Sequence, residues 1–179
     1  MSYRIQIGIV ELTLKTIIVH TLTYMFMGIL AYNFLHYDEA FAAPELSCWM
    51  RQTSDPLVMA GPLFQPIRGL IFAFAFYPIR QILFGKKNGW LIMWWLLVAL
   101  GVLSTFGPAP GSVEGMVYTV LPISIGSYLE VIPQALLLSG LLFYWVNNLD
   151  KIWLNWIMVV AFIIIMILPI LGLISGNPS

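Results

Sequence analysis

Apolar side chains occupy the chain in long runs, and polar residues gather in short stretches between them. A bilayer core about 30 Å thick requires about 20 predominantly apolar residues in a helix that crosses it. The runs have this length and lack the alternation of half-buried strands, so they predict an all-α, polytopic membrane bundle. The predicted spans are residues 10–35, 56–84, 90–106, 129–146 and 152–173.

Two segments between these runs are predicted to lie on the outer side of the membrane. Residues 36–55 carry several charges and no long apolar run, which indicates a loop. Residues 107–128 begin with GPAPGS, the densest turn signal in the chain. Since residues 112–146 are too long for one straight span, we expect Pro122, Gly126 and Ser127 to break them. A short re-entrant or interfacial helix at 112–121 would then precede the fourth span.

The first apolar run has features of a retained signal anchor. The apolar core of a cleaved signal peptide is about 7–15 residues long, whereas residues 16–35 have spanning length. Glu11 and Lys15 are spaced i,i+4 at the start of the helix, where they can pair. We expect the anchor to be retained, with cleavage after Ala42 as the alternative.

Two further motifs predict where helices begin. Asp55 directly precedes Pro56, and this pair suits the N-cap and the first helical position. Ser127 and Glu130 match the capping box S-x-x-E. The second motif would make Glu130 a helix-start residue at the membrane interface.

Composition supports the membrane class and excludes one group of partners. Of 179 residues, 60% are hydrophobic and 9% are charged, against about 25% charged in a soluble domain. Eight basic and eight acidic side chains cancel, so the chain has no basic field for nucleic acid. We therefore expect partners in or beside the lipid bilayer, either another membrane protein or a second copy of this chain.

Basic residues in short loops predict the orientation, because cytoplasmic loops carry an excess of them. With the N-terminus inside, Arg51 is the basic residue left on the outer side. The basic residues on the cytoplasmic side are then Arg4, Lys15, Arg80, Lys86, Lys87 and Lys151. We expect an integral protein of a bacterial inner (plasma) membrane with a cytoplasmic N-terminus and an outer C-terminus.

The second run contains one sequence pattern twice, ending at Arg68 and again at Arg80. Arg80 stands close to a pair of lysines and is predicted to be an ordinary interfacial anchor. Arg68 is surrounded by Leu, Ile and Phe, and it lies about 18 Å along a helix from Arg80. A charge at that depth costs about 2.5–3.5 kcal/mol or more unless it is paired or hydrated, so Arg68 marks a candidate functional site.

We hypothesise a polar pocket around Arg68 in the outer leaflet. Its candidate ligand-binding residues are Arg68, Glu114, Glu130, Gln65, Tyr118 and Gln134. Glu114 and Tyr118 share a helix face by their i,i+4 spacing, as do Glu130 and Gln134. The alternatives are that Arg68 belongs to a structural ion pair or extends outward to the interface, and that Glu114 lies in water.

The sequence predicts no cofactor, metal or catalytic set. His20 and His36 would lie about 24 Å apart along a helix, too far to hold one haem. Cys48 is the single cysteine, and the chain contains no common metal, nucleotide or nucleophile motif. Gly101 is predicted to be a helix-packing position.

Three functions fit these observations. The first, which the sequence favours, is a small non-enzymatic subunit or partner-binding protein with a polar site around Arg68. The second is a transporter or ligand-binding protein that uses Arg68 with Glu130 or Glu114. The third is a membrane-embedded enzyme acting on a lipid headgroup, with Glu114 as its acid or base.

Overall fold

The computed structural model of the chain describes residues 7–48, 50–107, 109–120 and 125–175, and these fold into helices without a strand. Arg4 and Pro122, on which the orientation and the predicted break partly rest, lie outside the described residues. The helices are α1 (Ile9–Phe34), α2 (Tyr37–Ala42), α3 (Pro44–Ser47), α4 (Pro56–Met59), α5 (Gly61–Phe76), α6 (Arg80–Leu83), α7 (Gly89–Val98), the π-helix η1 (Ala99–Leu103), α8 (Val113–Tyr118), α9 (Ile125–Val146) and α10 (Ile152–Ser175).

Three helices in the described part of the chain are long and apolar enough to cross a membrane. Their qualifying segments are Ile9–Phe34, Tyr128–Val146 and Ile152–Gly172. Two apolar helices, Gly61–Phe76 and Gly89–Leu103, are shorter. The structure is therefore that of an α-helical membrane protein, and the five spans stay a prediction.

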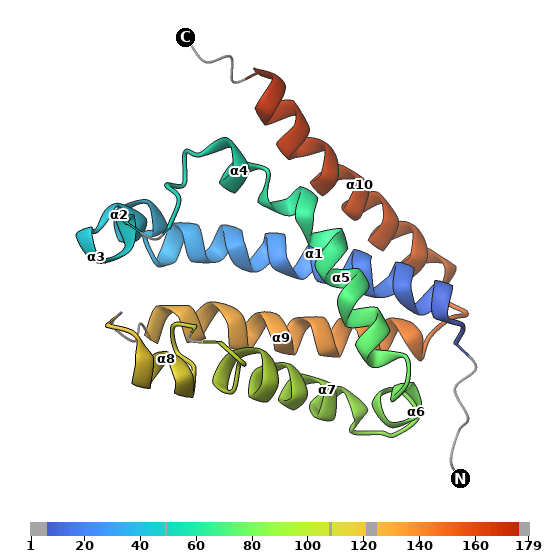
Figure 1. The fold of residues 1–179 in the computed structure, drawn as a ribbon. Helices are drawn as coiled ribbons and strands as arrows, with labels where there is room; N and C mark the ends of the chain where they lie inside the picture. Colours follow the sequence, from blue (N-terminus) through green and yellow to red (C-terminus); the bar gives the residue numbers. More distant parts are fainter. Residues whose placement is uncertain (1–6, 49, 108, 121–124, 176–179) are drawn as a thin grey trace.

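The bundle is built around α1, which packs against α5, α9 and α10 (Figure 1). On the far side of α9 from α1 lies α7, while α5 crosses α1 obliquely (Figure 1). Since α7 packs on α9 and α5 packs on α1, the helices α5 and α7 face each other over the α1–α9 pair. This arrangement positions the candidate site.

The predicted second helix, residues 56–84, is not continuous in the structure. It consists of α4, α5 and α6, with interruptions at Ala60 and between Phe76 and Arg80. Pro78 accounts for the second interruption, because it lacks an N–H and clashes with the preceding turn. Pro66, in contrast, lies inside α5, which continues through it.

The two predicted helix starts have opposite outcomes. The carboxylate of Asp55 accepts a hydrogen bond from the Leu57 amide at 2.8 Å, which confirms it as the N-cap of α4. That bond, together with Arg51, lowers the pKa of Asp55. In contrast, α9 begins at Ile125, so Gly126 and Ser127 lie within the helix. The predicted capping box and the predicted break at these two residues are therefore wrong.

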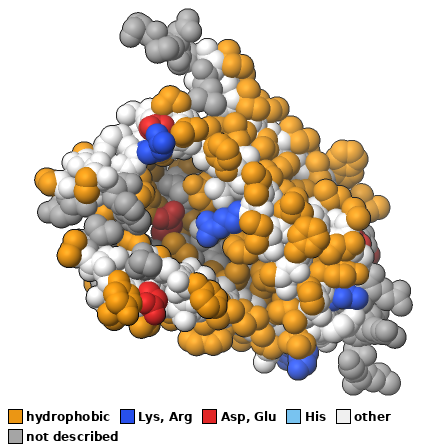
Figure 2. Space-filling view, viewed as in Figure 1, with side chains coloured by type: hydrophobic (Ala, Val, Ile, Leu, Met, Phe, Trp, Pro, Cys, Tyr) orange, Lys and Arg blue, Asp and Glu red, His pale blue; other side chains and the backbone are white. Residues whose placement is uncertain are grey.

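Several polar side chains inside the bundle are satisfied by their own helix. Buried threonines on α1 donate to backbone carbonyls of their own helix, as Thr16 does to Leu12 at 2.7 Å and Thr23 does to Val19 at 2.9 Å. Such bonds let polar residues face neighbouring helices where water is absent. The outer surface is instead largely hydrophobic (Figure 2), and only 6% of the apolar window of α10 is buried. This surface suits contact with lipid.

Candidate functional site

A cavity of about 390 Å³ lies between α5 and α7, with α1 and α9 behind it. We call it the Arg68 groove. Figure 2 shows a hollow on this face in which basic and acidic side chains lie among hydrophobic ones. The groove is lined by His20, Arg68, Phe72, Ala75, Phe76, Ile79, Leu96, Leu97, Leu100, Gly101, Val102, Val131, Gln134, Ala135 and Leu138.

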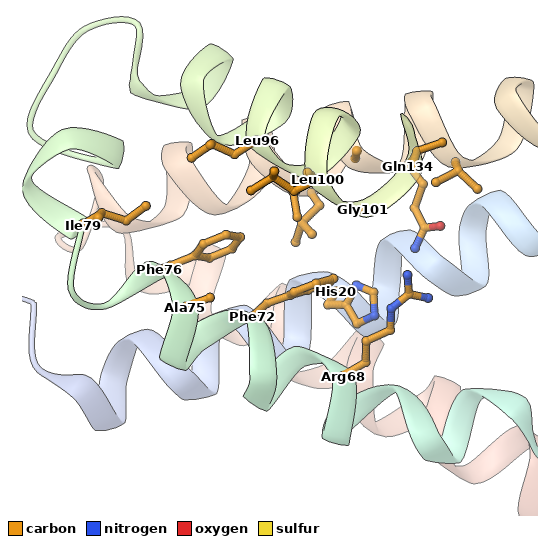
Figure 3. A pocket seen from close by; sticks show the side chains of 15 residues that line it. His20, Arg68, Phe72, Ala75, Phe76, Ile79, Leu96, Leu100, Gly101 and Gln134 are labelled. Carbon is orange, nitrogen blue, oxygen red and sulfur yellow. The ribbon is translucent and has the colours of Figure 1, made fainter. Parts of the chain in front are cut away.

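The polar lining residues gather at one end of the Arg68 groove. Figure 3 shows Arg68 from α5 and Gln134 from α9 extending toward each other, with His20 of α1 beside them. The ring of His20 is buried, and its Nε2 lies 3.1 Å from Oε1 of Gln65. Gln65 in turn donates to the carbonyl of Gly61 at 3.2 Å, so this end of the groove has a fixed polar wall.

Arg68 has no direct counter-ion in the described part of the chain. The described residues form two ion pairs, Glu11–Lys15 and Arg51–Asp55. No carboxylate oxygen of a described residue lies within 4.0 Å of the Arg68 guanidinium. Its guanidinium lies 5.7 Å from the centre of the Phe72 ring, a weak cation–π contact. Among the described residues, the structural ion pair predicted as an alternative for Arg68 is therefore absent.

Glu130 lies near Arg68 but is bound to another residue. Arg68 is near enough to Glu130 to act on it electrostatically, but among the described residues no ion pair joins the two. The Glu130 carboxylate accepts a hydrogen bond from the hydroxyl of Tyr37 in α2. Burial and this bond raise the pKa of Tyr37, so the phenol remains protonated and able to donate. This hydrogen bond joins α2 to α9 beside the polar end of the groove.

The other end of the Arg68 groove is hydrocarbon. Phe76 and Ile79 line it from the α5 side, and Leu96 and Leu100 line it from the α7 side (Figure 3). On that side the wall includes η1, and π-helical turns occur frequently at functional sites. A Cβ added at Gly101 would have no atom within 4 Å. Gly101 therefore borders open space, and its predicted role in helix packing is wrong.

The structure brings together part of the predicted site. Arg68 and Gln134 line one cavity, with Gln65 and Glu130 adjacent to its polar end. Glu114 and Tyr118 lie on α8 with exposed side chains, and neither lines the Arg68 groove. Whether Glu114 lies in water, its alternative interpretation, stays a prediction. Among the described residues, no group of three or more His, Cys, Asp or Glu could hold a metal ion.

Sequence reasoning missed His20 and Tyr37 as neighbours of this site. The signal for His20 is its spacing from Thr16 and Thr23, which places the three on one face of α1. That face is buried against α5 and α9. Tyr37 has no such signal, because its contact with Glu130 joins residues that are far apart in the chain.

Comparison with known proteins gives no family for the chain. No protein-family model, curated protein or solved structure matches it.

Proposed function

We propose that this is a non-enzymatic, multi-pass protein of a bacterial inner membrane that binds a membrane-soluble ligand in the Arg68 groove. The predicted orientation, with the N-terminus in the cytoplasm, puts Arg68 in the outer half of the bilayer. Ligand binding was one of the alternatives inferred from the sequence, and of these alternatives the cavity supports it best.

The observation that carries this proposal is the composition of the groove. A charged and two other polar residues meet at one end, and the remaining wall is apolar. Its volume of about 390 Å³ falls within the range of about 300–1,000 Å³ for small-molecule sites. Apolar walls with a few convergent polar groups are the usual form of such sites.

The enzyme and transporter alternatives have less support. Glu114, the residue suggested as acid or base, is exposed on α8 and away from the groove lining. For transport, the Glu130 carboxylate would have to leave Tyr37 and pair with Arg68. In the structure it accepts a hydrogen bond from Tyr37. A partner protein or a second copy of the chain remains a prediction, and the exposed face of α10 is available for it.

Filling the groove tests the proposal. Gly101→Leu would place a side chain in the cavity without a clash at Cβ, and Gly140→Leu is a matched control because its Cβ also meets nothing within 4 Å. After mild detergent extraction, native mass spectrometry is expected to find a retained amphiphile on the wild type and on Gly140→Leu. Gly101→Leu should lose it. Equal retention by all three proteins would refute ligand binding in the groove.

Cysteine accessibility tests the proposed orientation. In a Cys48→Ala background, Glu114→Cys is expected to react with a membrane-impermeant maleimide added outside spheroplasts, because α8 is predicted to lie on the outer side. Lys87→Cys, in the predicted cytoplasmic turn, should react only after the membrane is permeabilised. Labelling in the reverse order would show that the orientation is wrong.

A further inference from the structure

The polar end of the Arg68 groove is suited to an oxyanion. A guanidinium carries five N–H donors and no acceptor, and no hydrogen bond holds that of Arg68 among the described residues. Gln134 is 9% exposed and extends toward Arg68 from the opposite helix (Figure 3). Its amide likewise has no hydrogen-bond partner in the described part of the chain. Two sets of donors therefore converge from α5 and α9.

The surroundings favour an anion over a neutral group at this position. The acidic side chain that acts on Arg68, Glu130, accepts from Tyr37 and makes no ion pair with Arg68. His20 and Gln65 are engaged with each other. Ionisable residues within a membrane usually pair with one another or with backbone carbonyls, and a ligand oxyanion would supply such a partner for Arg68.

The apolar end defines the rest of the ligand. From Arg68 to Phe76 the groove follows α5 for about 12 Å, and it continues past the end of that helix to Ile79. That length suits one acyl chain. The wall over this distance includes Phe72, Phe76 and Leu96 and has no charged side chain among the described residues.

We propose that the ligand is a single-chain lipid with a small anionic head, bound with its oxyanion at Arg68 and Gln134 and its chain along α5 toward Ile79. This assignment rests on the proposed function and names its ligand class. The head must be small because the predicted position of Arg68 is within the hydrocarbon core. Carboxylate and monoalkyl phosphate heads share this chemistry.

Four probes separate the head from the chain. Palmitate and hexadecyl phosphate carry both parts, hexadecanol carries the chain without the charge, and inorganic phosphate carries the charge without the chain. With the full-length protein in phosphatidylcholine nanodiscs, we expect both anionic amphiphiles to bind at least about tenfold more tightly than hexadecanol or inorganic phosphate.

Variants locate the binding. Arg68→Gln is expected to weaken palmitate binding about tenfold or more, whereas Arg68→Lys retains part of it and Gln134→Leu weakens it less. Arg51→Gln, a change at an exposed arginine in the predicted outer loop, is the matched control and should have no effect. Because the side chain of Arg68 is exposed, the two Arg68 variants should fold.

The outcomes distinguish the two proposals. If hexadecanol binds as tightly as palmitate and Gly101→Leu blocks both, the groove binds a neutral lipid and the anionic assignment is wrong. If inorganic phosphate binds as tightly as palmitate, the ligand is a free anion and not a lipid. If Gly101→Leu changes the binding of no probe, the proposed function itself fails.

Discussion

Replacing Trp145 with alanine is expected to destabilise the protein by about 3 kcal/mol, at the lower end of the cost of truncating a buried aromatic side chain. The lower end applies because lipid tails are as apolar as the protein interior, so apolar surface exposed to lipid costs less than apolar surface exposed to water. Trp145 is only 3% exposed. The measurement is the unfolding free energy from a denaturant titration in mild detergent, followed by circular dichroism.

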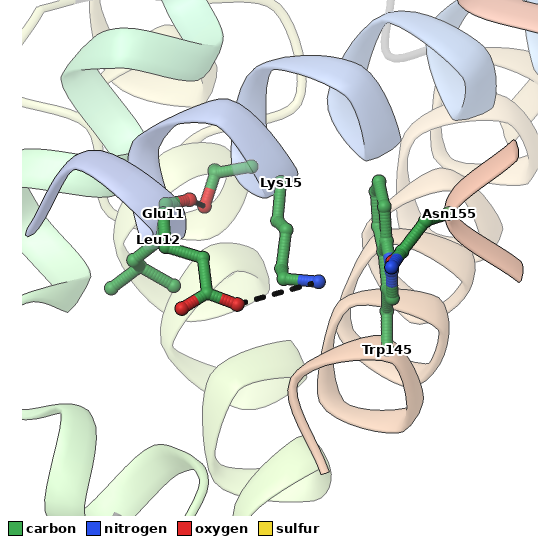
Figure 4. Close-up of polar contacts among 6 residues, drawn as sticks. Glu11, Leu12, Lys15, Trp145 and Asn155 are labelled. Atoms are coloured by element: carbon green, nitrogen blue, oxygen red, sulfur yellow. Dashed lines mark hydrogen bonds and ion pairs between the residues drawn. The ribbon is translucent and has the colours of Figure 1, made fainter. Parts of the chain in front are cut away.

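Trp145 connects three helices at the predicted cytoplasmic end of the bundle (Figure 4). Its indole Nε1 donates to Oδ1 of Asn155 in α10 at 2.6 Å. The buried ammonium of Lys15 in α1 lies 4.2 Å from the centre of its ring and 3.7 Å from Glu11. Alanine would remove the aromatic contact of Lys15 and the hydrogen bond of Asn155 together.

Two variants separate these contributions. Trp145→Phe keeps the ring over Lys15 and loses the hydrogen bond to Asn155, so it should have intermediate stability. Trp156→Ala is the control, because Trp156 is 68% exposed and should contribute little to folding. The account of this contact is wrong if Trp145→Ala is no less stable than Trp156→Ala.

Replacing Gly69 with valine is expected to destabilise the protein by about 2–3 kcal/mol, because it forces α5 away from α1. A Cβ at Gly69 would lie 2.7 Å from Cα of Ile17 and 3.3 Å from its backbone nitrogen. A backbone atom cannot rotate away as a side chain can. Gly69 and the fully buried Ala73 are small residues four apart, and such residues let membrane helices approach closely.

Replacing each glycine with alanine gives a sharper comparison, because the change in stability should have opposite signs at the two positions. At an open position, glycine to alanine stabilises a helix by about 0.5–1 kcal/mol, and this is the result expected for Gly140→Ala. Gly69→Ala should destabilise instead, despite the same gain in helix propensity. Thermal unfolding in mild detergent measures both, and a Gly69→Ala protein that unfolds at or above the wild-type temperature would contradict the close contact.

Local features of this fold could be predicted from the sequence because they depend on neighbours in the chain. Glu11 and Lys15 pair as their spacing predicts, and Asp55 caps α4 ahead of its proline. The interruption at Pro78 also follows from the chemistry of one residue. Each of these involves at most five consecutive residues.

The candidate site was less predictable because it depends on how helices pack. Arg68 could be selected by its depth in an apolar run, yet its neighbour His20 comes from a helix that precedes it by a whole loop. Ser127 matched a capping box, but helix α9 extends beyond it. Glu114 had suitable chemistry and spacing, and the placement of α8 keeps it away from the groove. The residue types alone could not show which of these three predictions the packed helices would contain.

A density map of the protein, released from its native membrane in mild detergent, tests the central claim most directly. The account predicts elongated density in the Arg68 groove, with its head between Arg68 and Gln134 and its chain extending along α5 to Ile79. A well-resolved map with an empty groove, or with ordered lipid only on the outer face of α10, would contradict it.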